Sequence, residues 1–584
     1  MLADPRKGFA LLWTHAMRLA DARRLRSAAP AAKRSAEPEP LIEAKPNRRP
    51  GCLMEASMYC DIQVTVDSDP HNDRSESWLA VNPLNPYNMV GSSKRFVNPA
   101  TYDFSLSAYA TFDGGYTWTE ALPLGLLSDP DPNKVWAGVS DPAVAWDNLG
   151  NCYIVALPFP SPSSPYETLG IAVYRSTDGG RTWSAPNYIH PNPGDDKQSA
   201  AGDGTPGSPH FGNVYAAWDN GSRLAFARTT DHGATWTGVG AHPVGAGLDT
   251  VVTDSFSPEV TVARDGTVYI VWVAGEEFGN TIKFVMSTDG GQSFSAPQVV
   301  ASGITQLKSP PLPAPDGFPE LPGGTFRVLT IASACCGAGS NLVVAWADYR
   351  DGVSRVYYRN SGDGGAIWQG PASGQPLLPA WLASGTDQHD FHPQLASRPN
   401  GEIACAFYEF GPKGGARLID VILATSTDNG ASFTSRDTVT DRPWDPTVDA
   451  PLSHGAPGTT FIGDYFGLAG STLGFFPFWT DTRTGIQEIF TAKPMQLGPW
   501  VGTQFTGTVA AGQTHRWYTF NWPACWHVVW TVVPTTPHPG APQITWQVQV
   551  ERASANEITY WISITNLTAA PVNIEARYVV LAAD

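Results

Sequence analysis

The sequence predicts an all-β fold built from a repeated unit of short strands, and three observations lead to this prediction. One eight-residue motif recurs six times along the chain of 584 residues. Gly and Pro number 57 and 51 while charged residues make up only 16%, a composition that suits short strands joined by tight turns. Runs rich in β-branched and aromatic residues, such as 268–273 and 282–287, precede the motif.

The repeated motif has the pattern S/T-x-D-x-G-x-T/S-W/F, and only Ile367 departs from the hydroxyl residue at the seventh position. Its aspartate can accept backbone N–H groups within a turn, and the following glycine tolerates a positive φ. The terminal aromatic ring is large enough to pack between neighbouring sheets. We therefore predict a structural role, not a catalytic one, for the six aspartates: Asp113, Asp178, Asp231, Asp289, Asp363 and Asp428.

The motif resembles the Asp-box (BNR) repeat, whose best-known carriers are sialidases. This resemblance implies a β-propeller with the box between the third and fourth strands of each blade. Successive aspartates are 65, 53, 58, 74 and 65 residues apart, so the stretch from Asp61 to Met495 holds about seven units. A strand set without a box follows the sixth copy, and residues 61–66 can supply its missing fourth strand. We predict seven blades, with six as the alternative because sialidase domains have six.

Three segments are expected. Residues 1–50 carry eleven Lys and Arg against five Asp and Glu, and residues 8–26 can form an amphipathic basic helix. Residues 51–495 hold the propeller. Residues 496–584 contain no box but have dense, alternating strand signals and seven Trp, which predicts a small β-sandwich.

Composition disfavours some classes of function. The net charge is −17, which argues against nucleic acid as a partner. No run of about 18 apolar residues predicts a transmembrane helix. The start of the chain is a poor secretory signal, so a cytoplasmic, particle-associated or non-standard exported location is expected.

Arginines that follow the second strand of several units are the first candidate ligand-binding residues. The sequences around Trp346 and Trp479 both read W-x-D-x-R, and several convergent arginines could bind a carboxylate bidentately. The alternative is that each aspartate–arginine pair fixes its own turn. This group comprises Arg95, Arg223, Asp348, Arg350, Asp481 and Arg483.

The resemblance to sialidases also implies an F/Y-R-I-P motif, a tyrosine nucleophile with a glutamate base, and an aspartate acid. The motif is absent, and the nearest match, at 326–329, lacks the proline, so no catalytic role is transferred to it. No spacing selects a catalytic pair, and the residues of suitable type are Glu76, Glu259, Tyr408, Glu409 and Tyr465. Glu76 and Glu259 begin inner strands and could face the central channel.

No cofactor is predicted. Two clusters, 387–392 and 463–465, contain side chains that can bind metal ions, but neither has a recognised ligand spacing, so hydrogen-bonded loops are the favoured interpretation.

Three functions remain open. The first is a recognition module for a glycan or protein surface without hydrolase activity. The second is an exo-sialidase-type glycoside hydrolase. The third is a structural subunit of a larger assembly, attached through residues 1–50. Whether the protein is an enzyme is not decided by the sequence.

Overall fold

The computed structural model describes residues 59–65, 73–98, 103–121, 136–160, 168–242, 244, 250–274, 279–315, 317–451, 458–494, 500–523, 526–554 and 557–583. The chain divides into two compact units, one over Asp61–Pro494 and one that includes Met495–Asp584. The predicted basic helix at 8–26 lies outside the described residues. Among the described residues, no helix is long and apolar enough to cross a membrane.

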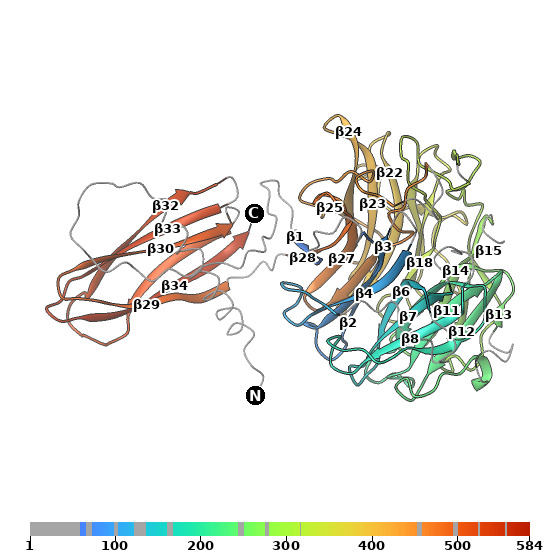
Figure 1. The fold of residues 1–584 in the computed structure, drawn as a ribbon, viewed down its shortest axis with the longest axis horizontal. Helices are drawn as coiled ribbons and strands as arrows, with labels where there is room; N and C mark the ends of the chain where they lie inside the picture. Colours follow the sequence, from blue (N-terminus) through green and yellow to red (C-terminus); the bar gives the residue numbers. More distant parts are fainter. Residues whose placement is uncertain are drawn as a thin grey trace. The chain divides into compact units, whose positions relative to one another are not determined.

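The first unit contains seven four-stranded sheets, each antiparallel, as expected for the blades of a propeller (Figure 1). The first four sheets are, in order, β2 (Arg74–Val81), β3 (Met89–Asn98), β4 (Asp103–Thr111) and β5 (Thr119–Glu120); β6 (Gly138–Trp146), β7 (Cys152–Phe159), β8 (Ile171–Ser176) and β9 (Asn187–His190); β10 (Asp195–Gly202), β11 (Val214–Asn220), β12 (Arg223–Thr229) and β13 (Thr250–Val252); and β14 (Phe256–Val262), β15 (Val268–Ala274), β16 (Thr281–Ser287) and β17 (Gln298–Ser302). One 3₁₀ turn, Val239–Ala241, lies between β12 and β13.

The last three sheets complete the ring. They are β18 (Ser333–Cys336), β19 (Leu342–Asp348), β20 (Arg355–Ser361) and β21 (Gln375–Pro376); β22 (His389–Ser397), β23 (Ile403–Lys413), β24 (Ala416–Ser426) and β25 (Ser435–Thr438); and β26 (Gly467–Ser471), β27 (Gly474–Asp481) and β28 (Glu488–Pro494) with β1 (Tyr59–Gln63). The order β1-β28-β27-β26 means that the start of the first unit supplies the last strand of the seventh sheet, as the sequence predicts. The sheet count is therefore seven, and the alternative of six is wrong.

The first strand of each sheet lines the centre. Each of these strands contacts the first strand of the next sheet, and β26 contacts β2, which closes the ring. Apolar side chains fill the space between sheets, and fully buried tryptophans such as Trp218, Trp346 and Trp479 anchor the second strands. Closure leaves few unpaired strand edges, which stabilises the ring.

The Asp-box aspartates are all bonded within their own turns. In the second copy, Asp178 Oδ1 accepts the backbone N–H groups of Arg181 and Thr182, both at 2.9 Å. Its other oxygen accepts the Thr182 hydroxyl at 2.6 Å. The same hydroxyl bond, at 2.5–2.6 Å, recurs in four other copies, and the fifth copy has Ile367 at that position.

This difference predicts a stabilising substitution. Ile367 is 63% exposed, so little apolar burial is lost when it is replaced. Ile367→Thr would place a hydroxyl where Asp363 Oδ2 can accept it, and we expect the melting temperature to rise by about 1–2 °C. Ile367→Val, which has the shape of threonine without the hydroxyl, is the matched control in differential scanning calorimetry. Equal shifts in the two variants would contradict the explanation.

The second unit is made of six strands in two three-stranded sheets. One sheet has the order β29 (Trp500–Val509), β34 (Val572–Ala583) and β31 (Trp526–Pro534), and the other has β30 (Thr514–Pro523), β33 (Glu557–Asn566) and β32 (Ile544–Arg552). Side chains of both sheets share one hydrophobic core, in which the Trp522 ring contacts Trp530 and Tyr578 edge-on. Trp561 instead lies on the outer face, stacked on Tyr518.

Candidate functional site

Five first strands of the propeller carry a β-bulge, and the same position of each bulge has a left-handed backbone. The register shifts near the start of β2, β6, β10, β14 and β22. The residues there are not glycine although their φ angles are all between 48° and 52°: Glu76, Asp141, Lys197, Ser257 and His392. Such conformations are unfavourable for these residue types, and they cluster at functional sites because the fold must enforce them. We call these five the bulge residues.

Four bulge residues meet side chains from loops and from one second strand. Lys197 of the third sheet contacts Asp464, which precedes the seventh sheet, so the contact crosses the centre of the ring. Arg327, from the connection between β17 and β18, binds the same aspartate. We define the central cluster as Glu76, Lys94, Asp141, Lys197, Arg327, His392, Asp464 and Tyr465.

Two carboxylates of the cluster are joined through a serine. Ser140 Oγ lies 2.5 Å from Asp141 Oδ1 and 3.3 Å from Glu76 Oε2. Burial and the negative charge of Asp141 raise the pKa of Glu76 to about 8, although Lys94, 3.9 Å away, acts in the opposite direction. Burial also works to raise the pKa of Asp141, but Lys197 and Lys94 outweigh it and hold that pKa below its ordinary value. At neutral pH Glu76 is therefore mostly protonated and Asp141 is ionised, which is the arrangement of an acid and a base.

Asp464 forms ion pairs with two cations of the cluster, Arg327 and Lys197. Arg327 donates Nε–H to Asp464 Oδ1 at 2.9 Å and its Nη2 contacts Oδ2, while Lys197 Nζ lies 2.5 Å from Oδ2. Burial of Asp464 works to raise its pKa, but these two cations together hold it well below its ordinary value. Arg327 also lies over the ring of Phe461, 4.5 Å from its centroid. The guanidinium is thus bidentate on a carboxylate of the protein itself.

Two further members of the cluster have unused hydrogen-bonding groups. Both ring nitrogens of His392 and the hydroxyl of Tyr465 are buried and have no hydrogen-bond partner among the described residues. Burial lowers the pKa of His392 to about 4 and raises the pKa of Tyr465, so both are neutral at pH 7. Such groups are rare in folded proteins and call for an explanation, for which a bound ligand is one candidate.

Gly463 allows Tyr465 to reach the cluster. The φ angle of Gly463 is 94°, and a Cβ at this position would lie 2.7 Å from the backbone nitrogen of Glu76. Only glycine fits so close to the neighbouring chain in this conformation. The negative charges of Asp141 and Glu76 both act on the Tyr465 hydroxyl and contribute to its raised pKa.

Two of the predicted arginines, Arg350 and Arg483, bind carboxylates and a carbonyl of the propeller itself. Arg350 contacts Asp348 of its own turn and donates to Ser373 O at 2.7 Å. Arg483 contacts Asp481 of its own turn at 2.6 Å. It also binds Asp61 at 2.6 Å and contacts Asp441.

The other two predicted arginines lie apart from these. Arg95 is on β3, beside Arg74 in the ladder, and its side chain is partly buried. Arg223 begins β12 and is exposed. The structure does not bring the four arginines together with one another in any contact among the described residues.

The predicted glutamates Glu259 and Glu409 form their hydrogen bonds and ion pairs outside the cluster. Glu259 Oε1 accepts the backbone N–H of Ala334 at 3.1 Å and lies 3.3 Å from the Gln394 amide, so it joins three blades. Burial raises the pKa of Glu259 to about 8. Glu409 pairs with Lys413 and Arg436.

Tyr408 is fully buried, and its hydroxyl accepts the N–H of Thr480 at 3.3 Å. It lies beside the cluster, since its ring centroid is 6.2 Å from that of His392.

The segment 387–392 spreads its side chains in different directions. Asp387 pairs with Arg417, Asp390 lies 3.9 Å from Arg355, and His392 joins the central cluster. In the part of the chain that the structure describes, no group of three or more His, Cys, Asp or Glu is placed to hold a metal ion.

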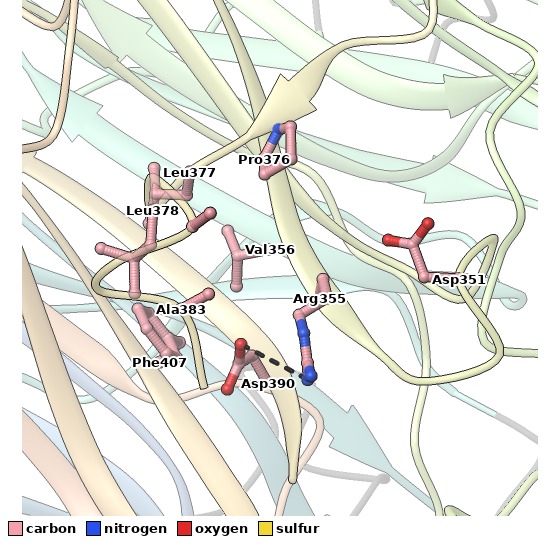
Figure 2. A pocket seen from close by; sticks show the side chains of 10 residues that line it. Asp351, Arg355, Val356, Pro376, Leu377, Leu378, Ala383, Asp390 and Phe407 are labelled. Atoms are coloured by element: carbon pink, nitrogen blue, oxygen red, sulfur yellow. Dashed lines mark ion pairs between the residues drawn. The ribbon is translucent and has the colours of Figure 1, made fainter. Parts of the chain in front are cut away.

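A cavity of about 260 Å³ lies between the fifth and sixth sheets, apart from the cluster (Figure 2). Leu377, Leu378 and Phe407 line one side, and Asp390 and Arg355 point toward each other at its edge. The guanidinium of Arg355 already donates hydrogen bonds to four backbone carbonyls. The cavity therefore offers mainly an apolar surface.

A smaller cavity has a volume of about 120 Å³, and no cluster residue lines it. It is lined by Phe256, which precedes a bulge residue, and by Leu329, two positions after Arg327. Residues 306–309 and 317, together with Pro319 and Thr330, complete its wall.

Sequence reasoning missed Asp141 and Lys197, and it considered Glu76, Arg327, His392 and Tyr465 only one by one. One local signal was available. In three of the five bulges the left-handed residue precedes a proline: Asp141-Pro142, Ser257-Pro258 and His392-Pro393. A residue followed by proline at the start of several first strands marks the bulge, although it does not show which side chains meet.

Comparison with known proteins identifies the repeat and several proteins of similar structure. The BNR/Asp-box repeat model matches residues 174–185. No match was found among curated protein sequences. A Dyadobacter fermentans protein of unknown function is similar in structure, with a TM-score of 0.39 and 16% identity over 62% of this chain and 97% of that one.

Two sialidases are also similar in structure. The Hadza microbial sialidase Hz136 gives a TM-score of 0.38 and 15% identity over 63% of this chain and 68% of that one. Trypanosoma rangeli sialidase gives a TM-score of 0.36 and 11% identity over 88% of this chain and 92% of that one. The chain thus carries an Asp-box repeat, and its β-propeller is established by its own closed ring of seven sheets.

Proposed function

We propose that the central cluster of this Asp-box β-propeller binds a saccharide and that the protein is a glycan-recognition module. The observation that carries the proposal is the ring of bulge residues, since five blades hold non-glycine residues in an unfavourable conformation at one position. Four of them belong to the central cluster, and two of these four, Asp141 and Lys197, carry a charge at neutral pH. Hydroxyl-rich ligands require many donors and acceptors held in place, which such a ring supplies.

A glycan array with the full chain, followed by titration calorimetry of each hit, tests this proposal. Tyr465→Phe and His392→Ala remove the groups that have no partner within the protein, and each is expected to weaken binding about tenfold. Tyr87→Phe and His538→Ala are the controls, because both residues are exposed and lie outside the cluster. Binding that survives unchanged in both cluster variants would place the ligand elsewhere.

Glycoside hydrolysis is a second candidate, favoured by one specific observation. Glu76 and Asp141 form a carboxylate pair with separated pKa values, and such a pair can supply a proton donor and an ionised partner. Turnover of 4-methylumbelliferyl glycosides by the purified protein tests it. Silence in both assays would favour the structural-subunit hypothesis and an attachment through residues 1–50.

A further inference from the structure

Two of the three cations of the central cluster are already bound to its own carboxylates. Arg327 directs two donors at Asp464, and Lys197 lies between Asp464 and Asp141. Asp464 is fully buried, so solvent does not weaken these contacts. A ligand carboxylate would have to displace Asp464 from the guanidinium and would leave that aspartate buried without its partner.

The unused groups of the cluster are neutral. The Tyr465 hydroxyl can donate one hydrogen bond and can also accept one. Neutral His392 has one N–H donor and one nitrogen acceptor. His392 is only 4% exposed, so a ligand that binds it has to reach into the cluster. A sugar hydroxyl both donates and accepts, and it matches these groups better than a carboxylate, which only accepts.

The charges of the cluster point the same way. Lys94 lies 3.9 Å from Glu76, and Lys197 and Arg327 contact Asp464, so each cation already faces a carboxyl group of the protein. An additional buried anion would pay a desolvation cost and would have to compete with these carboxyl groups for the cations.

We propose that the ligand of the central cluster is an uncharged saccharide, recognised through its hydroxyl groups, and not a sugar acid. This inference rests on the proposed glycan-binding function. It specifies the substrate class of the same site and applies equally if the site hydrolyses its ligand.

The experiment compares matched ligand pairs on the full wild-type chain. Methyl glucoside is compared with methyl glucuronide, methyl galactoside with methyl galacturonide, and lactose with 3′-sialyllactose, by titration calorimetry. We expect the neutral member of any bound pair to bind at least about tenfold more tightly. Tighter binding of the acidic member would overturn the inference and leave the proposed function intact. Absence of binding to neutral and acidic glycans alike, on the array as well, would overturn the proposed function and the inference with it.

A variant tests the physical cause. Asp464→Asn releases Arg327 and Lys197 from their shared carboxylate, so the preference for neutral ligands is expected to fall at least about tenfold. Asp387→Asn is the control, because this exposed carboxylate binds Arg417 away from the cluster. An unchanged preference in folded Asp464→Asn would overturn the explanation.

Salt dependence in the wild type provides a test that needs no variant. Raising NaCl should leave the affinity for the neutral ligand within about twofold, since no ligand charge is screened. A large loss of affinity for the tightest ligand would show recognition of charge and would contradict the inference.

Discussion

Replacing Arg483 by alanine is expected to destabilise the propeller by about 3–5 kcal/mol, because the change leaves a buried group of carboxylates without its cation. Arg483 binds Asp61 and Asp481 at 2.6 Å each and contacts Asp441. Its side chain is only 5% exposed. Burial works to lower the pKa of Arg483, but Asp481 and Asp61 outweigh it and raise that pKa, so the guanidinium stays charged.

The position of Arg483 in the chain explains why the effect should be large. Asp61 lies on β1, which closes the ring by adding to the seventh sheet, and Asp481 ends β27 of that sheet. The arginine therefore links the first strand of the propeller to the last sheet. Without it, β1 should detach more often, and limited proteolysis near residue 60 should become faster.

Denaturant unfolding of the full chain measures this effect. Arg577→Ala is the control, since this arginine is 51% exposed on its side chain and its loss should change the free energy of unfolding by less than about 0.5 kcal/mol. Arg483→Lys keeps the charge without the planar fork and should fall between the two. Equal stability of Arg483→Ala and Arg577→Ala would show that the closure does not depend on this contact.

Replacing Glu76 by glutamine is expected to lower any glycosidase turnover about 10²–10⁴-fold, because the amide cannot donate the proton that the protonated carboxyl supplies. Turnover should also depend on pH. The pKa of Glu76 is raised to about 8, so the proton is present below that value and is lost above it. Turnover of the wild type should therefore fall about tenfold per pH unit above pH 8.

The control for this variant is Glu259→Gln. Glu259 is also a buried glutamate of a first strand with a pKa of about 8, but it joins blades at Ala334 and Gln394 rather than entering the cluster. We expect its turnover to stay within about twofold of the wild type. Equal turnover by Glu76→Gln and the wild type would remove Glu76 from the mechanism, and no turnover by the wild type would contradict hydrolysis and leave the glycan array to test recognition.

The repeated sheets could be predicted because their signals are local. Each Asp box fits in eight residues, and its aspartate bonds to groups at most four positions away, as Asp178 does with Thr182. The spacing of the boxes gives the number of sheets. The strand at 61–66 follows from the same count, since the seventh set lacks one strand.

The arginine candidates illustrate a limit of repeated patterns. The W-x-D-x-R sequences recur because each serves its own turn, as the Arg350–Asp348 contact does. Arg483 has the same local contact and gains Asp61, 422 positions away, only because the ring closes there. A repeated spacing therefore predicted the local pair and not the long-range one.

The sequence by itself determined the strand-rich repeat, the box turns, the closure of the ring and the separate C-terminal strands, because each depends on contacts between residues close in the chain or on a count of units. Only the tertiary structure decided the central cluster. Its members come from widely separated segments, and the bulge position is occupied by Glu, Asp, Lys, Ser and His in turn, so no repeated letter marks it. The physical reason is that a propeller repeats its backbone while the side chains facing its centre must differ in order to complement one another.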